Sequence, residues 1–173
     1  AIAMRMGEAL DQSTLDPANS HESLLLRLGL PAGKYWICKR TPFHAYEAME
    51  CLGGNGVTED FIMARLYREA PINAIWEGSG NVQALDMLRA LGKTPAVLDT
   101  WFAELDKTRG SDARLDKAVD ALKREFSDMD EAEYRARDIV DRVSLTMQAS
   151  QLVAAGNTAV AEAFIASRLG EHG

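Results

Sequence analysis

The sequence lacks several features that would assign it to a class at once. No stretch approaches the roughly 18 to 20 consecutive apolar residues of a membrane-spanning helix, which excludes a transmembrane role. The only cysteines, Cys38 and Cys51, are too few for a disulfide framework and lack zinc-site spacing. His21 and His44 have no ligand partners at helical spacing, and His172 lies in the tail, so no metal site is expected. We expect two buried thiols in a reducing, cytoplasmic compartment.

Positive charge is also scarce. Lysine and arginine total 19 against 26 acidic residues, a net charge of −7, and residues 94–173 hold 10 basic and 15 acidic residues. A polyanion would meet net repulsion, so nucleic acid is a poor default partner. Only small basic groups at Lys39-Arg40, Arg65, Arg68 and Lys123-Arg124 could form a footprint. For Arg65 and Arg68 the default interpretation is salt bridges on a helix face.

Signals for β-strands are almost absent, because apolar residues mostly recur at spacings of three and four rather than alternating. The sequence therefore predicts an all-α fold. With 173 residues, 47% of them hydrophobic, the chain is long enough to bury a core in one domain or in a domain with an appended part. It begins at Ala1 without an initiator methionine and already in a helical pattern, so we expect a fragment of a longer protein.

Start and stop signals predict at least eight helical segments. We expect a short first helix ending near Asp11, a second capped by Ser20 and reaching Leu28, and a third from Pro31 to about Leu52. Turns are expected at Gly110, Ser127-Asp128 and Gly156-Asn157. They separate three helices whose apolar stripes are Leu115, Val119, Leu122 and Phe126 in the first, Ala132, Ala136, Val140, Val143 and Met147 in the second, and Val160, Phe164 and Ile165 in the third. A boundary at Gly92–Pro95 predicts two parts, residues 1–93 and 94–173.

Two segments stand out as candidates for chemistry. The first runs from Glu50 to Val57 and contains Gly-Gly-Asn-Gly directly after a helix. Such glycines are commonly a helix stop and tight turn, although they can also let backbone amides approach a phosphate or ribose. In the second segment, Glu77 follows Trp76 just before a helix that Ser79 can cap. Glu77 is either a solvated or capping residue, or a general base whose pKa rises by desolvation and falls near the helix start.

Taken together, these segments resemble the C-terminal helical domain of the acyl-CoA dehydrogenases. The pattern of these flavoproteins contains a Gly-Gly-Asn-Gly turn, then an aromatic-Glu-Gly-Thr/Ser segment that opens a helix. The stretches at residues 34–40, 64–71, 75–82 and 166–170 resemble the AidB-type, adaptive-response branch. The resemblance implies an up-down helical bundle, with residues 94–173 as the additional C-terminal helices of that branch.

The resemblance also implies roles for individual residues. Glu77 matches the family's catalytic base, which removes the α-proton of an acyl-CoA thioester while the β-hydride passes to FAD. The positions that match cofactor-binding residues are Gly53, Gly54, Ile75, Trp76, Ser79 and Asn81. Gly53 and Gly54 match a turn that approaches the FAD of a neighbouring subunit, which implies a homo-oligomer, either a dimer or a tetramer. Asn81 stands in place of the usual Gln and Trp76 in place of the usual Tyr.

The resemblance also implies partners, and two other classes of function stay open. The resemblance implies an acyl-CoA substrate and further N-terminal and β domains of the same chain, without which the fragment should be catalytically silent. One alternative is a DNA-binding, alkylation-response domain without efficient dehydrogenase activity. The other is a purely oligomerisation module in which Glu77 merely caps a helix. The flavin content of the full-length protein discriminates between the last alternative and an enzyme.

Overall fold

The described part of the chain folds into helices joined by turns. A computed structural model describes residues 1–170, which form eight α-helices and two short 3₁₀ helices, with no strand among them. The predicted all-α class and the predicted number of helical segments are therefore confirmed. His172 lies outside the described residues.

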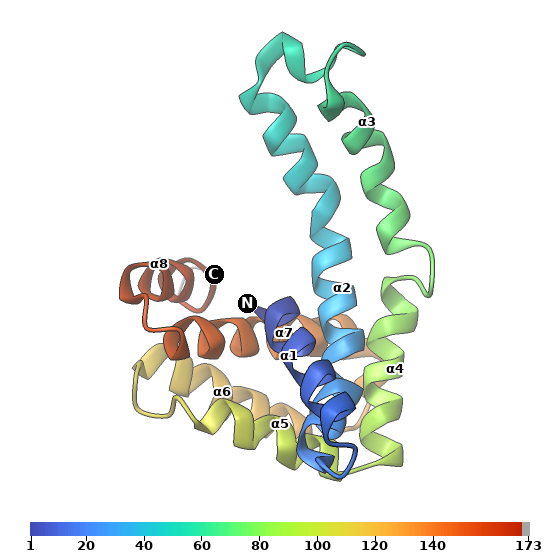
Figure 1. Cartoon of the computed structure of the whole chain (residues 1–173). Coiled ribbons are helices and arrows are strands. Elements are labelled where there is room, and N and C mark those ends of the chain that lie inside the picture. Colours follow the sequence, from blue (N-terminus) through green and yellow to red (C-terminus); the bar gives the residue numbers. More distant parts are fainter. Residues whose placement is uncertain (171–173) are drawn as a thin grey trace.

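A single long helix organises the molecule (Figure 1). The elements in chain order are α1 (Ile2–Leu15), α2 (Ser20–Cys51), η1 (Gly53–Gly56), α3 (Ile62–Glu69), η2 (Ala70–Ala74), α4 (Gly80–Lys93), α5 (Ala96–Asp106), α6 (Ala113–Ser127), α7 (Ala132–Ala154) and α8 (Thr158–Arg168). Helices α1, α4, α5 and α7 all pack against α2. The turns expected at Gly110, Ser127-Asp128 and Gly156-Asn157 lie where predicted.

Helix α2 is one helix rather than the two that were predicted. Asn19, not Ser20, is its cap, and its side-chain oxygen accepts a hydrogen bond from the Glu22 amide. The helix then continues through Gly29 and Pro31, where a break was expected. Both residues are buried in the packed interior, so tertiary packing outweighs their poor helix propensity.

One continuous core joins the two parts of the chain. The largest fully buried side chains include Leu25 in α2, Met87 in α4, Trp101 in α5 and Ile139 in α7. The predicted apolar stripes of α6 and α7 are buried, as expected. In α8 the prediction was wrong for Val160, which is exposed because only the Ile165 side of this short terminal helix is fully buried.

A buried ionic cluster ties α1, α2 and α5 together. Arg5 donates to Glu104 at 2.6 Å and to Glu22 at 2.8 Å. Burial alone would raise the pKa of Glu104, but hydrogen bonds from Arg5 and Lys107 outweigh it and lower this pKa to about 2. Because Arg5 is the only charge in α1 directed into the core, the cluster fixes how α1 docks.

The last third of α2, together with η1 and α3, forms a hairpin that projects from the rest of the molecule, which we call the distal arm (residues 41–69; Figure 1). This arm exposes many large apolar side chains, namely Phe43, Tyr46, Leu52, Val57, Phe61, Ile62, Leu66 and Tyr67. Many large apolar side chains exposed on one segment typically mark an interface.

The expectation of two buried thiols was wrong. Cys38 is only half-buried and Cys51 is exposed, because Cys51 is the last residue of α2 and lies on the distal arm, away from the core. Within residues 1–170, none of the helices has the length and apolar character to cross a membrane.

Candidate active site

Glu77 lies in a strained turn between η2 and α4. It has a φ of 54°, in the left-handed region that a side chain rarely adopts, and the following Gly78 has a φ of 106°. Both Glu77 and Trp76 are exposed, Trp76 to 55%. The desolvation of Glu77 that the general-base interpretation requires is therefore not provided by this chain alone.

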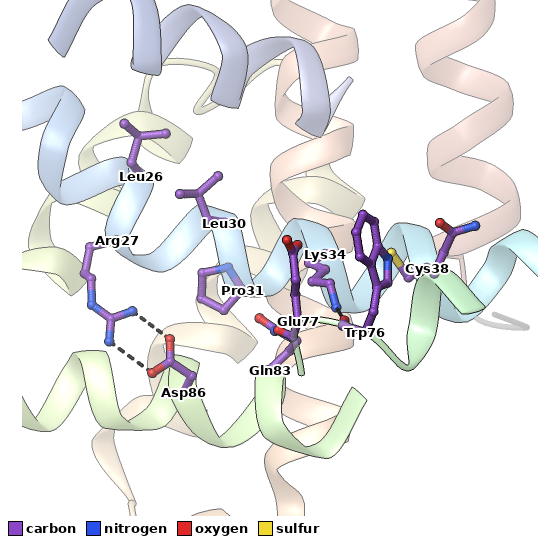
Figure 2. A pocket seen from close by; sticks show the side chains of 11 residues that line it. Leu26, Arg27, Leu30, Pro31, Lys34, Cys38, Trp76, Glu77, Gln83 and Asp86 are labelled. Carbon is purple, nitrogen blue, oxygen red and sulfur yellow. Dashed lines mark hydrogen bonds and ion pairs between the residues drawn. The ribbon is translucent and has the colours of Figure 1, made fainter. Parts of the chain in front are cut away.

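The turn borders an open cleft of about 610 Å³ between α2, α4 and the residues that precede α4 (Figure 2). Leu26, Leu30 and Pro31 of α2 and the indole of Trp76 give the cleft apolar walls. No hydrogen bond or ion pair engages the Glu77 carboxylate among residues 1–170, where only its main-chain carbonyl accepts a hydrogen bond. An unengaged carboxylate on an apolar cleft is available to act on a ligand.

The other carboxylate of the cleft is engaged. Arg27 of α2 donates to both oxygens of Asp86 in α4, at 2.9 and 3.2 Å, and these hydrogen bonds lower the pKa of Asp86. Figure 2 shows this pair at the end of the cleft away from Trp76. It joins α2 to α4 and leaves Glu77 as the acidic group with a free carboxylate.

Two side chains that were not predicted hold the Glu77 turn. The Lys34 ammonium group of α2 donates to the carbonyl oxygens of Trp76 and Gly78, the latter at 2.8 Å. The Gln83 amide of α4 donates to the carbonyl oxygen of Glu77 at 2.9 Å. Lys34 lies in one of the stretches that resemble the family, but no local pattern shows which backbone group its side chain reaches.

Ser79 directly precedes α4 and is its cap residue, as predicted. Its side chain, however, makes no capping hydrogen bond. Nearby, the Asn81 side-chain oxygen accepts a 2.6 Å hydrogen bond from Arg137 of α7. Residues 94–173 therefore contact a predicted cofactor residue directly, which the sequence did not indicate.

The Gly-Gly-Asn-Gly turn forms η1 at the tip of the distal arm, and its glycines have different local requirements. Gly53 has a φ of 58°, and a Cβ on Gly56 would lie 2.1 Å from the Met49 carbonyl oxygen. Gly54 meets neither restriction, because it has no positive φ and nothing lies within 4 Å of its Cβ position. The local turn explains Gly53 and Gly56 but not Gly54.

The structure brings together only some of the predicted site residues. Ile75, Trp76, Glu77, Ser79 and Asn81 follow one another at the start of α4. In contrast, Gly53 and Gly54 lie beyond the end of α2, about 25 Å along the helix from Lys34 at 1.5 Å per residue. The glycine turn and Glu77 therefore lie in different regions of one chain.

The basic groups that could bind nucleic acid are mostly paired. Arg40 contacts Asp141, Arg65 contacts Glu69, Arg68 contacts Glu59 and Lys123 contacts Asp106, all within 3.2 Å. The predicted salt bridge on a helix face is confirmed for Arg65, whose partner Glu69 lies four residues later in α3, whereas the partner of Arg68 lies in the turn before α3. Each local acidic partner offsets the attraction that a phosphate backbone would feel.

Comparison with known proteins identifies the class to which this helical bundle belongs. Residues 1–92 match the sequence profile described as acyl-CoA dehydrogenase, C-terminal domain. The match ends beside the boundary expected at residues 92–95. The chain belongs to the acyl-CoA dehydrogenase family.

Among individual relatives, the chain is 39% identical over 165 residues to AidB of Escherichia coli (strain K12), covering 95% of this chain and 29% of that protein. It is 27% identical over 126 residues to butyryl-CoA dehydrogenase of Syntrophomonas wolfei, covering 71% and 20% of the two chains. The resemblance to the AidB-type branch is confirmed. The chain spans less than a third of the length of either relative.

Solved structures show the same fold. The structure titled Bd2924 apo-form superimposes with a TM-score of 0.71 at 26% identity, over 97% of this chain and 30% of that one. Caenorhabditis elegans ACDH-11, in complex with C11-CoA, superimposes with a TM-score of 0.81 at 24% identity, over 99% and 33% of the two chains.

Proposed function

We propose that this chain is the C-terminal part of an FAD-dependent acyl-CoA dehydrogenase, in which Glu77 is the catalytic base. The observation that carries the proposal is the free Glu77 carboxylate on an apolar cleft, in a turn whose backbone is strained and is held by hydrogen bonds from Lys34. Strained backbone of this kind is found preferentially at functional sites. Ser79, not Glu77, occupies the cap position of α4, so capping this helix does not account for the conformation of Glu77.

The chemistry assigned to Glu77 is proton abstraction. Its carboxylate takes the α-proton of an acyl-CoA thioester, and the electron pair of that bond forms the new double bond between Cα and Cβ. FAD, when bound, supplies the acceptor for the hydride that leaves Cβ. Because an α-proton of a thioester is weakly acidic, the carboxylate works best in a dry site. We infer that the acyl chain and the other domains exclude water from the side of the cleft that this chain leaves open.

The residues near Glu77 suit part of an FAD site. Ile75 and Trp76 present exposed apolar surface, which a flavin ring would cover. Ser79 is the cap residue of α4 and Asn81 lies in its first turn, where unpaired main-chain amides favour a negatively charged group. We assign Gly54, with Gly53, to the FAD of a neighbouring copy, because no local requirement explains Gly54 and the turn lies far from Glu77 in one chain.

The same assignment accounts for the partners. We propose that the distal arm is covered in a homo-oligomer or by the remaining domains, because it exposes large apolar side chains. The acyl-CoA complex of the ACDH-11 neighbour supports an acyl-CoA thioester as the ligand class. Residues 94–173 would then act as an extension packed on residues 1–93, with Arg137 at their contact.

The test uses the full-length protein. Its absorption spectrum is recorded alone and after anaerobic mixing with short-, medium- and long-chain acyl-CoA thioesters. We expect a flavin spectrum that bleaches with at least one thioester. A full-length protein without flavin would support the oligomerisation alternative, and a flavin that no thioester bleaches would argue against dehydrogenase activity.

A further inference from the structure

Three successive carbonyl groups around Glu77 are held by two side chains from two helices. Lys34 of α2 donates to the Trp76 and Gly78 oxygens, and Gln83 of α4 donates to the Glu77 oxygen. Figure 2 shows Lys34 reaching from α2 toward the turn, with Gln83 on the α4 side. Every carbonyl of the turn therefore has a donor that is anchored on a packed helix.

The conformation of the turn requires such support. Glu77 has a positive φ without being glycine, so its backbone is unfavourable unless neighbouring groups fix it. At the next position the φ of 106° favours glycine, and a Cβ on Gly78 would lie 2.7 Å from the Gln83 side-chain nitrogen and displace it from its place beside the turn. The absence of a Cβ at Gly78 therefore leaves room for the Gln83 side chain to reach the Glu77 carbonyl.

Lys34 acts on the backbone rather than on the carboxylate. It makes no ion pair with Glu77 within residues 1–170, although both residues border the same cleft. Neighbouring α2 residues Pro31 and Tyr35 are buried, so the stem of Lys34 starts from a fixed position. The ammonium group thus sets where the turn lies while the Glu77 carboxylate remains free.

We propose that Lys34, assisted by Gln83, is a positioning residue that holds the Trp76–Gly78 turn so that the Glu77 carboxylate faces the cleft in one orientation. The proposal rests on the proposed function for its catalytic consequence. Misplacement of a catalytic group by about 1 Å can lower a rate by roughly 10²-fold. Loss of the Lys34 donors should therefore slow proton abstraction without removing the base.

The test begins with three variants of the full-length protein. Lys34→Met removes the donors while keeping a long side chain, and Gln83→Met removes the other donor at a half-buried position outside the hydrophobic core. Lys117→Met is the matched control, since Lys117 is exposed on α6, far along the chain from the turn. FAD content and thermal unfolding of each variant are measured first, and rates are normalised to bound FAD.

Flavin reduction is then followed at saturating acyl-CoA, using the thioester that bleaches the unmodified protein fastest. We expect Lys34→Met to reduce its flavin roughly 10-fold or more slowly, Gln83→Met to lose less, and Lys117→Met to match the unmodified protein. Adding Lys34→Met to Glu77→Gln should change the rate by less than about 2-fold, because Lys34 acts through Glu77. If the role of Lys34 were purely structural, Lys34→Met would slow flavin reduction by the same factor in the unmodified protein and in Glu77→Gln.

Two results separate the hypotheses. If Glu77→Gln is slow while Lys34→Met and Gln83→Met reduce flavin at the unmodified rate, the positioning role is wrong and the base assignment stands. If Glu77→Gln is as fast as the unmodified protein, the proposed function fails and the catalytic role of Lys34 fails with it.

A second measurement needs no substrate. Amide hydrogen exchange of the peptide containing Trp76 to Gly80 should be at least several-fold faster in Lys34→Met than in the unmodified protein and in Lys117→Met, because the turn loses two of its three clasping bonds. Unchanged exchange would show that Lys34 does not hold the turn, and would overturn the proposal even for a protein whose flavin no thioester bleaches.

Discussion

The buried Arg5–Glu104 pair should make the stability of the chain depend on pH in a defined way. The pKa of Glu104 falls from 4.5 to about 2 on folding, although burial alone would raise it, because Arg5 and Lys107 donate hydrogen bonds to the carboxylate. A group whose pKa is lowered by folding stabilises the protein above its unfolded pKa. This contribution is complete above about pH 5 and is lost as the pH falls toward 2.

The lowered pKa of Glu104 contributes about 3 kcal/mol to the free energy of unfolding at neutral pH, and roughly 1.5 kcal/mol at about pH 3. Glu104→Gln keeps the shape of the side chain but removes its charge, and it leaves Arg5 with Glu22 as its remaining close partner. We expect the variant to lose about 3 kcal/mol of unfolding free energy at pH 7, the scale of a broken buried ion pair.

Urea-induced unfolding of the 173-residue chain at about pH 7 and about pH 3 measures both quantities. The matched control is Glu162→Gln, which removes a carboxylate that also pairs with an arginine but is 62% exposed. Its effect should stay within about 0.5 kcal/mol at either pH. A loss below about 1 kcal/mol for Glu104→Gln at pH 7, or a loss that does not shrink at pH 3, would refute the electrostatic explanation.

Three further predictions concern the glycine turn and the isolated chain. Gly56→Ala should destabilise the chain by about 1 to 3 kcal/mol, because its Cβ would press on the Met49 carbonyl, whereas Gly54→Ala should change unfolding in urea by less than about 0.5 kcal/mol. The isolated chain should self-associate through its exposed apolar surface, so a strictly monomeric species in light scattering from micromolar to near-millimolar concentration would contradict the account. The purified chain should also be colourless, because its few contacts cannot offset the entropy of immobilising FAD; stoichiometric bound flavin in its absorption spectrum would disprove this.

Much of the fold could be predicted because apolar spacing reports burial directly. The stripe from Leu115 to Phe126 and the stripe from Ala132 to Met147 both lie in the core. The error at Gly29 and Pro31 has a physical reason, since both residues are poor helix formers whose cost is offset by contacts with other helices. Local propensity carries no information on those contacts.

The site shows the same limit. Glu77 and its neighbours could be singled out because they are consecutive in the sequence and precede a helix. Lys34, Gln83 and Arg137 could not, because each acts on a residue that another element brings within reach. Arg5 was likewise missed, since a lone arginine in an amphipathic helix gives no sign that Glu104 receives it.

The most direct test of the account is the rate of flavin reduction in full-length Glu77→Gln. Gln keeps the shape and hydrogen bonding of the side chain but removes the basic carboxylate. We expect reduction by the best acyl-CoA thioester, followed by anaerobic rapid mixing, to be roughly 10²-fold slower or more, with FAD content almost unchanged. If Glu77→Gln reduces its flavin as fast as the unmodified protein, Glu77 is not the base, and the base must lie in another part of the protein.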